Sequence, residues 1–447
     1  MKRVITYGTF DLLHYGHINL LRRAKELGDY LIVGVTSENY DRYRGKLNVR
    51  QSLSERIEGV RSTGLADEII VEEYEGQKID DIQRYHADIF AIGSDWAGRF
   101  DYLREYCQVI YLERTKGISS TELRDQMHPQ VRFGIVGSGR IARRFVLESK
   151  YVSGCSVDGV FNPHAGSAQR FAKEQELSFA CTDYDDLLSR VNAVYIASPH
   201  DTHAEYIRAA LLAGRHVLCE KPMVLTERES QELFSLAKKQ GVVLLEALKT
   251  AYCPGFKRMV SCAKSGKIGR IVSVDASFTK LTPESSRELR GDGFGGSMTE
   301  LASYPLLAIF RLLGTEYDSI RFTSMRNAEG VDLFTRMEIQ YPHAVASAKV
   351  GLGVKTEGDL VVSGTRGYVY VPAPWWKTDY FELRYEDPAE REREFYKFAG
   401  DGLRYEMVEF LNAIAAGTMK QDAILLSQAL ARAIEKFRAG ENTESFM

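Results

Sequence analysis

The stretch VRFGIVGSGRIA, residues 131–142, joins an apolar strand to a glycine-rich turn and to the start of a helix. A second apolar strand ends about 20 residues later, as a βαβ unit that binds a dinucleotide requires. Gly137 permits the tight turn, Gly139 lets the backbone approach a pyrophosphate, and Ala142 lets the helix pack closely on the strand. We therefore expect this stretch to open a dinucleotide-binding Rossmann domain.

The second strand of this unit ends at Phe161-Asn162-Pro163, where an acidic residue would normally bind the adenosine ribose. Asp158 lies inside the strand, and Arg170 follows some way on, so the choice between NAD and NADP stays open. The residues predicted to bind the cofactor in this unit are Gly137, Ser138, Gly139, Arg140, Ile141 and Asn162.

An earlier strand, residues 3–7, leads into a second glycine turn, GTFDLLHYGH at residues 8–17. His14 and His17 are three residues apart, and Gly16 lets the backbone approach a ligand without a Cβ in the way. Attack at the α-phosphorus of a nucleoside triphosphate increases the negative charge on its oxygens, and imidazoles at a helix N-terminus can stabilise that charge. The turn therefore predicts a nucleotidyl-transfer site.

Strand-like and helical stretches alternate on both sides of these turns, which favours parallel sheets covered by helices. After about residue 251 strand candidates predominate, which favours a mainly antiparallel sheet. The predicted fold is α/β: a Rossmann-like nucleotidyltransferase domain, a dinucleotide-binding Rossmann domain, and an α+β domain that ends in two amphipathic helices. The predicted boundaries are 1–127, a short linker at 128–130, 131–250 and 251–447.

The composition narrows the range of functions. A chain of 447 residues suggests about three domains. The net charge of −3 gives no sign of a nucleic-acid or membrane surface. The six cysteines are scattered, no leader precedes the first strand, and no apolar run reaches the ~18 residues of a spanning helix. We expect a soluble, cytoplasmic protein.

Four separated motifs lie within residues 1–127: the turn at 8–17, Lys46 after a basic loop, GSDW at 93–96, and RTKGISST at 114–121. Together they resemble the glycerol-3-phosphate cytidylyltransferase family. The resemblance implies in-line transfer of CMP from CTP, carried with Mg²⁺, to an alcohol phosphate. It assigns His14 and His17 to the α-phosphate, Lys46 and Arg114 to the other phosphates, and further nucleotide contacts to Thr9, Phe10, Gly16, Asp95, Trp96, Thr115, Ser119, Ser120 and Thr121.

Three points in this part stay open. Asp11 either faces the acceptor or caps a turn, and Lys46 could be a solvated residue among neighbouring arginines. Residues 118–121 also resemble adenylyltransferase signatures, so ATP is an alternative to CTP. Leu12-Leu13, together with the arginine motif at 114–117, favours CTP.

The later motifs YIASPH (195–200), THAE (202–205) and CEKP (219–222) resemble the glucose–fructose oxidoreductase, inositol dehydrogenase and rhizopine-catabolism (Gfo/Idh/MocA) family over residues 131–440. The resemblance implies that Lys221 binds the reacting oxygen and the cofactor, and that Tyr304 donates or accepts the proton. Glu300, four residues before Tyr304, would share its helical face and contact the substrate. Further cofactor contacts are assigned to Ser198, Pro199, His200, His203 and Glu220.

Many relatives carry Asp and His where this chain has Glu300 and Tyr304, so the role of Glu300 is open and Tyr304 could serve packing alone. His200 and His203 have a spacing that could suggest a metal, but no cysteine or carboxylate partner stands at ligand spacing. No protein metal ligand is therefore predicted, and the expected cofactors are NAD or NADP, with Mg²⁺ on CTP.

The two resemblances predict a bifunctional enzyme that makes a CDP-alditol for surface polysaccharide and also oxidises or reduces a small keto or hydroxy sugar, polyol or their phosphates. Glycerol phosphate is the favoured acceptor. The alternatives are CDP-ribitol synthesis from a ketose phosphate, or an adenylyltransferase with a non-catalytic cofactor-binding half. The expected partners are CTP, a polyol phosphate, a small keto or hydroxy substrate and further copies of the chain.

Overall fold

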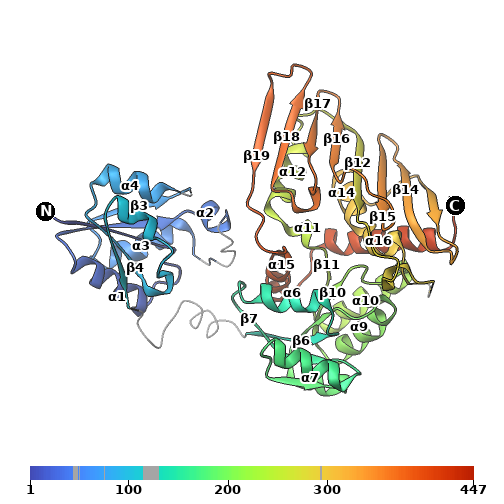
Figure 1. Ribbon diagram of the computed structural model, residues 1–447, viewed down its shortest axis with the longest axis horizontal. Coiled ribbons are helices and arrows are strands. Elements are labelled where there is room, and N and C mark those ends of the chain that lie inside the picture. Colours follow the sequence, from blue (N-terminus) through green and yellow to red (C-terminus); the bar gives the residue numbers. More distant parts are fainter. Residues whose placement is uncertain (44–48, 50, 75, 114–129, 292–293, 447) are drawn as a thin grey trace. The chain divides into compact units, whose positions relative to one another are not determined.

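The computed structural model describes residues 1–43, 49, 51–74, 76–113, 130–291 and 294–446. It forms two compact units, Met1–Gln130 with Val152–Gly154, and Val131–Tyr151 with Cys155–Met447 (Figure 1). Each unit is described by itself. Six of the predicted site residues lie outside the described residues: Lys46, Arg114, Thr115, Ser119, Ser120 and Thr121.

The first unit is built on a parallel sheet with the strand order β3-β2-β1-β4-β5. Val4 and Leu31 pack into one core, and the next residues along the same strands, Ile5 and Ile32, pack into a second core. This alternation buries both faces of the sheet. The strands are β1 (Arg3–Gly8), β2 (Tyr30–Thr36), β3 (Glu68–Glu72), β4 (Ile89–Gly93) and β5 (Gln108–Leu112).

The helices of the first unit connect these strands, and the strand order reverses between β1 and β4. Ligands of open α/β sheets bind at the carboxyl ends of the strands at such a reversal. The helices are α1 (Tyr15–Lys25), α2 (Glu38–Tyr43), α3 (Leu53–Ser62) and α4 (Gln77–Tyr85), with 3₁₀ turns η1 (Ser94–Trp96) and η2 (Asp101–Glu105).

The second unit begins with a six-stranded parallel sheet in the order β11-β10-β9-β6-β7-β8. Its order reverses between β6 and β9, where the predicted glycine turn lies. The strands are β6 (Val131–Val136), β7 (Cys155–Phe161), β8 (Phe179–Cys181), β9 (Ala193–Ile196), β10 (His216–Glu220) and β11 (Leu244–Ala247). The helices are α6 (Arg140–Ser149), α7 (Ala165–Glu174), α8 (Tyr184–Arg190), α9 (His203–Leu212) and α10 (Glu227–Gln240), with a 3₁₀ turn η3 (His200–Thr202).

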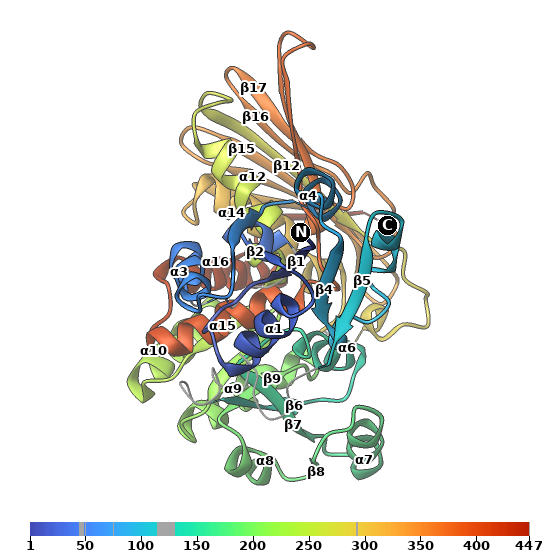
Figure 2. The same cartoon turned by 90° about the vertical axis from the view of Figure 1, so that its left-hand side faces the viewer.

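A nine-stranded sheet follows in the order β19-β18-β17-β16-β12-β15-β14-β13-β20. Its pairs are antiparallel except β12 with β15 and β13 with β20, so the predicted mainly antiparallel sheet is confirmed. Figure 2 shows β12, β15, β16 and β17 side by side within it. The strands are β12 (Ile271–Thr279), β13 (Ser319–Arg326), β14 (Asp332–Gln340), β15 (Val345–Gly351), β16 (Leu360–Gly364), β17 (Gly367–Val371), β18 (Tyr380–Tyr385), β19 (Arg391–Phe395) and β20 (Thr443–Phe446).

The helices of this part include three that pack on the nine-stranded sheet, α12, α13 and α14. Where one helix was predicted to carry Glu300 and Tyr304, the chain forms two, α13 and α14, separated at Ala302. Pro305 explains the break, because it has no N–H to continue the helical bonding into the preceding turn. The helices are α11 (Lys249–Tyr252), α12 (Pro254–Lys264), α13 (Ser297–Leu301), α14 (Ser303–Leu313), α15 (Leu403–Ala416) and α16 (Gln421–Arg438), with 3₁₀ turns η4 (Arg287–Leu289) and η5 (Trp375–Lys377).

A buried ion pair ties the C-terminal helices to the Rossmann domain. The Arg404 guanidinium of α15 donates to both carboxylate oxygens of Glu148 on α6, at 2.8 and 2.9 Å. The pKa of Glu148 is lowered: burial opposes ionisation, but the bonds and charge of Arg404 outweigh it. The last helices therefore belong to the cofactor-binding fold as well as to the sheet domain.

All six cysteines are free, and four of them are buried. Within the described ranges, no helix has the length and apolar character needed to cross a membrane.

Candidate active sites

The turn after β1 is tightly wound. Phe10 and Leu12 have φ angles of 52° and 47°, in the left-handed region that bulky residues rarely adopt. Gly8 makes room for this turn, because a Cβ there would lie 2.9 Å from the Phe10 ring. Strain of this kind concentrates at functional sites, and the turn leads directly into the predicted histidines.

His14 and His17 form a stacked pair at the start of α1. His14 is the N-cap residue, and its Nδ1 accepts a hydrogen bond from the Gly16 N–H at 3.1 Å, which leaves Nε2 as the protonated nitrogen of a neutral ring. The two rings have centroids 3.9 Å apart, and Phe10 packs edge-on against His17. Two imidazoles at a helix N-terminus suit the oxygens of a phosphate.

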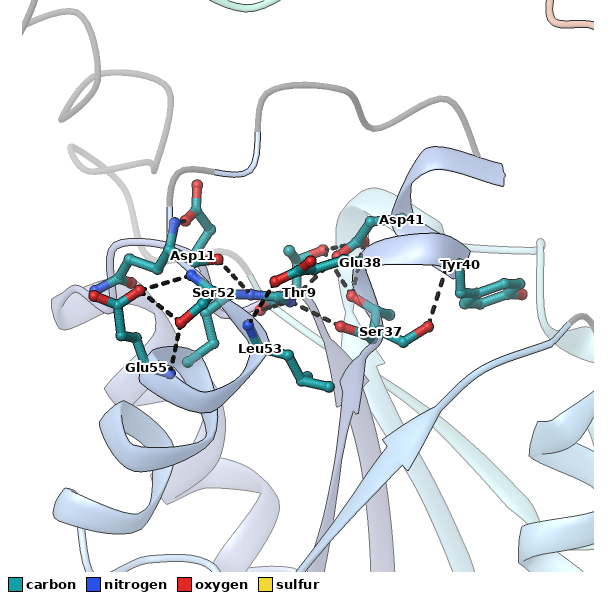
Figure 3. Close-up of polar contacts among 12 residues, drawn as sticks. Thr9, Asp11, Ser37, Glu38, Tyr40, Asp41, Ser52, Leu53 and Glu55 are labelled. Carbon is teal, nitrogen blue, oxygen red and sulfur yellow. Dashed lines mark hydrogen bonds and ion pairs between the residues drawn. The ribbon is translucent and has the colours of Figure 1, made fainter. Parts of the chain in front are cut away.

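A buried arginine of α3 supports this turn through hydrogen bonds, and Figure 3 shows two of the residues that it contacts, Thr9 and Asp41. Arg56 of α3 is 0% exposed, and its Nη1 donates to the carbonyl oxygens of Thr9 and Thr36 at 3.0 and 2.8 Å and to Asp41 at 3.2 Å. The Thr9 hydroxyl also donates to Asp41, at 3.0 Å. Sequence reasoning missed Arg56 and Asp41. One sequence pattern could have revealed Arg56: it lies on the apolar face of its helix, four residues before the buried Val60.

Asp11 is 2% exposed and fixes a neighbouring loop. Its Oδ1 accepts a hydrogen bond from the Gln51 N–H at 3.0 Å, and the Gln51 side chain accepts one from the Leu12 N–H at 2.7 Å. This geometry gives Asp11 the turn-holding role that the sequence left open. A contact between Asp11 and an acceptor stays a prediction.

Asp95 and Trp96 lie in η1, directly after β4. Because β4 pairs with β1, these residues stand at the same sheet edge as the histidine turn. Trp96 is 39% exposed, and the Arg99 guanidinium lies 5.5 Å from its ring centroid. The position suits stacking against a base or acceptor.

A cavity of about 390 Å³ lies near the carboxyl ends of β2 and β3. It is lined by Ser37, Glu38, Asn39, Leu53 and Glu73. Glu38 accepts a hydrogen bond from the Leu53 N–H at 3.2 Å (Figure 3). The two carboxylates make this cavity better suited to hydroxyl groups than to phosphate.

The glycine turn of the second unit has the geometry that a dinucleotide needs. Gly137 has φ of 96°, and a Cβ there would lie 2.7 Å from the Ala197 carbonyl oxygen, so only glycine fits. Gly139 caps α6, and a Cβ there would meet nothing, so its backbone is open to a pyrophosphate. Asn162 donates to the Ser138 hydroxyl at 2.9 Å and accepts from the His164 N–H, which fixes the residue where the ribose would lie.

Lys221 and Glu300 meet where β10 ends. The Lys221 Nζ donates to the Glu300 carbonyl oxygen at 2.8 Å, and the Glu300 carboxylate lies 3.1 Å from the His200 Nε2. Burial opposes ionisation of Glu300, but His200, Lys221 and Arg287 outweigh it and lower its pKa to about 2. Glu300 is therefore a fixed anion that orients His200 rather than a proton donor.

Tyr304 borders Lys221, with the Lys221 Nζ 6.0 Å from the phenol ring centroid. The ring also packs edge-on against Phe278, which stacks on Trp376. Burial raises the pKa of Tyr304, and the charges of Glu220 and Glu406 raise it further. The phenol is therefore protonated and can donate a proton. Despite the helix break, Glu300 and Tyr304 both reach Lys221.

Ser198 and Pro199 follow β9, and the next turn is held by a buried imidazole. His203 is 0% exposed, and its ring nitrogens lie 3.0 Å from the carbonyl oxygens of Ser198 and Pro222. Burial lowers the pKa of His203 to about 4, so the ring is neutral. It lies between the loop after β9 and the loop that carries Lys221, and it is the first residue of α9.

Comparison with known proteins separates the same two parts. A cytidylyltransferase-like family model matches residues 5–126. The model of the Gfo/Idh/MocA oxidoreductase family, NAD-binding Rossmann fold, matches residues 131–248, and the model of its C-terminal domain matches residues 256–370. Glycerol-3-phosphate cytidylyltransferase of Bacillus spizizenii is 51% identical over 127 residues, 28% of this chain and 98% of that protein.

The chain is a cytidylyltransferase fused to a Gfo/Idh/MocA-family oxidoreductase. Its oxidoreductase part is 27% identical to trans-1,2-dihydrobenzene-1,2-diol dehydrogenase of Bos taurus, over 69% of this chain and 96% of that one.

Solved structures share the fold of the oxidoreductase part. KijD10, a 3-ketoreductase from Actinomadura kijaniata in complex with NADP and TDP-benzene, has a TM-score of 0.64 at 24% identity and covers 71% of this chain and 100% of its own. Levoglucosan dehydrogenase in complex with NADH and levoglucosan has a TM-score of 0.62 at 18% identity and covers 70% of this chain and 97% of its own. Binding of a nicotinamide cofactor thus follows from the family, and the fold alone from these structures.

Proposed function

We propose that the cytidylyltransferase transfers CMP from CTP to a small polyol phosphate, giving a CDP-alditol and pyrophosphate. The observation that carries the proposal is the His14–His17 stack at the start of α1, within a stretch 51% identical to a glycerol-3-phosphate cytidylyltransferase. Glycerol phosphate is therefore the first acceptor to test. Mg²⁺ would come with the triphosphate, because phosphate oxygens are its preferred ligands.

The chemistry is an in-line displacement. A phosphate oxygen of the acceptor forms a bond to the α-phosphorus while the bond to pyrophosphate breaks. The Nε2–H of His14 would stabilise the charge that develops on the α-phosphate oxygens, together with His17 and the N–H groups of α1. Arg56 and Asp41 would act indirectly, by holding Thr9 and the strained turn in place.

We propose that the oxidoreductase reduces or oxidises a small keto or hydroxy sugar, polyol, or their phosphates. The bound nicotinamide supplies or accepts the hydride. Lys221 would hold the reacting oxygen, and Tyr304 would give that oxygen a proton on reduction. Glu300 would keep Lys221 and His200 in position, as its contacts to both residues support.

The two reactions fit one purpose. Reduction of a keto sugar phosphate yields a polyol phosphate, which is the class of acceptor that the transferase would use. We propose that the product serves as a precursor of surface polysaccharide, and that the chain assembles with copies of itself through the open face of the nine-stranded sheet. Light scattering coupled to size-exclusion chromatography tests the assembly.

Pyrophosphate release tests the transfer reaction. The protein would be incubated with CTP or ATP and with glycerol 3-phosphate, ribitol 5-phosphate or erythritol 4-phosphate. We expect release with CTP and at least one polyol phosphate, and a His14→Ala variant serves as the matched control. Release with ATP alone would replace the assignment by an adenylyltransferase, and no release with any pair would remove it.

NADPH and NADH oxidation with the matching ketose phosphates tests the second reaction. We expect oxidation that depends on Lys221. Tight cofactor binding without hydride transfer to any ketose would instead support a non-catalytic cofactor-binding half.

A further inference from the structure

Three glutamates from different elements interact electrostatically with Lys221 or Tyr304 of the redox site: Glu220 of β10, Glu246 of β11 and Glu406 of α15. Glu246 and Glu406 are only 2% and 1% exposed. So many carboxylates in a buried region cannot all carry a charge, because unpaired buried charges cost several kcal/mol each. Which of them keeps its proton therefore decides the charge beside Lys221.

Glu220 has the contacts of an ionised carboxylate. Its Oε1 accepts a hydrogen bond from the Tyr195 hydroxyl at 2.6 Å, and its Oε2 accepts one from the Lys221 N–H at 3.3 Å. The Tyr195 ring is itself fixed by stacking on Phe145, with centroids 3.7 Å apart. Glu220 thus ties the backbone of the catalytic lysine to a rigid aromatic pair.

Glu406 has the opposite surroundings. By hydrogen-bond distance and angle, neither of its carboxylate oxygens has a partner among the described residues. Burial raises the pKa of Glu406 and the charge of Glu220 raises it further, while the charge and the backbone N–H of Lys249 oppose these effects only in part. The titratable groups that face Glu406 are Glu220 of β10, Lys249 and Tyr252 of α11, Cys253 before α12, Glu148 of α6, Tyr195 of β9 and Tyr304 of α14.

We propose that Glu406 is a positioning residue of the redox site: as a neutral carboxylic acid it holds the single proton of the Glu220–Glu406 pair. Two interacting carboxylates cannot both ionise freely, so the proton stays on Glu406, which is more deeply buried than Glu220 and has weaker donor contacts. Glu220 then remains the anion that holds Tyr195 and the Lys221 backbone.

This arrangement matters for Tyr304. A charge on Glu406 would make the phenol harder to ionise, because both Glu220 and Glu406 act on it. A neutral Glu406 removes one of the two opposing charges and so favours proton donation to the reacting oxygen. The effect on Tyr304 rests on the proposed hydride transfer. The location of the proton on Glu406 does not depend on that proposal.

Infrared spectroscopy of the full chain locates the proton directly. At pH 9, where Glu246 with its pKa of about 7 is ionised, we expect the carbonyl-stretch band of a protonated carboxylic acid in the wild type and in Glu409→Gln, and its loss in Glu406→Gln. Glu409 is the matched control, because it lies on the same helix and pairs with Lys420 at 2.7 Å. A band that persists in folded Glu406→Gln, or a wild type without the band, would overturn the proposal.

A second variant tests the sharing of the proton and decides the matter if Glu406→Gln does not fold. In Glu220→Gln the neighbouring charge is gone, so the acid band should disappear at a lower pH than in the wild type. Titration at the same pH in both proteins would overturn the proposal. Neither readout needs a substrate, so a failure to find hydride transfer would affect the proposed function and leave this result intact.

Discussion

Glu246 offers a test of buried charge in the oxidoreductase that stability measurements can reach. It lies in β11, one residue before the end of the strand, is 2% exposed, and accepts a hydrogen bond from the Met223 N–H at 3.0 Å. Burial raises its pKa from 4.5 to about 7, although Ser427, Met223 and Lys221 all favour the ionised form. Replacing it by glutamine keeps the shape and the acceptor oxygen and removes the ionisation.

The size and sign of the effect follow from linkage. Below pH 4.5 the carboxyl is protonated in both the folded and the unfolded protein, so its burial does not lower the free energy of unfolding. Between pH 4.5 and about 7 the unfolded chain loses this proton while the folded protein keeps it, so the free energy of unfolding falls as the pH rises. Each pH unit is worth about 1.4 kcal/mol, so the loss reaches about 3 kcal/mol and is constant above pH 7.

Urea unfolding followed by tryptophan fluorescence measures this loss, since Trp375 and Trp376 both lie in the second unit. Relative to the wild type, Glu246→Gln should gain about 3 kcal/mol of stability between pH 5 and pH 8. Glu338→Gln is the control, because it replaces an exposed strand glutamate in the same unit. If the difference between Glu246→Gln and the wild type is the same at both pH values, Glu246 is ionised in the folded protein and the reasoning fails.

Three further variants test the two sites, and a fourth tests the buried ion pair between Glu148 and Arg404. His14→Ala should slow pyrophosphate release about 100- to 1,000-fold with NADPH affinity unchanged by fluorescence titration; equal loss of both would indicate misfolding. Lys221→Met should slow NADPH oxidation at least about 100-fold, and unaltered rates would exclude it from the reaction. Asn162→Asp should shift the NADPH-to-NADH ratio of dissociation constants toward NADH about tenfold, because a carboxylate binds ribose hydroxyls and repels a 2′-phosphate; an unchanged ratio would place the ribose elsewhere. Glu148→Gln should cost about 3 kcal/mol in urea unfolding by leaving Arg404 buried without its anion, and a cost under about 1 kcal/mol would class the pair with exposed ion pairs.

Local sequence patterns predicted much of the fold. The glycine turn at 131–142 and the alternation of strands and helices predicted both parallel sheets, because these patterns arise from short-range geometry. The strands β8, β13, β18, β19 and β20 were not predicted. β8 and β20 are only 3 and 4 residues long, and β19 is a run of charged residues whose place is set by pairing with β18. Such strands exist because a neighbour offers hydrogen bonds, which the local sequence does not encode.

The site residues show the same difference between features set by local sequence and features set by distant contacts. Motifs supplied His14, Lys221 and the glycine turn, each within a short stretch of chain. The residues that hold them were missed because they come from distant elements: Arg56 bonds Thr9 across 47 positions, and Glu406 lies far along the chain from Tyr304, on which its charge would act. A buried arginine or glutamate looks like an ordinary surface residue of an amphipathic helix until the packing is known.

The two reactions place opposite demands on buried charge, and the described residues meet them differently. Phosphoryl transfer needs donors around a growing anion, and the carboxylates near the histidine turn, Asp11 and Asp41, are both occupied by hydrogen bonds that hold the turn. Hydride transfer to a carbonyl needs a proton that can leave Tyr304, which extra negative charge would oppose. Keeping Glu406 neutral answers that demand without removing Glu220, the anion that orders the lysine loop. Since each set of carboxylates lies within its own unit, a rise in pH that ionises Glu406 should slow the redox reaction while cytidylyl transfer continues.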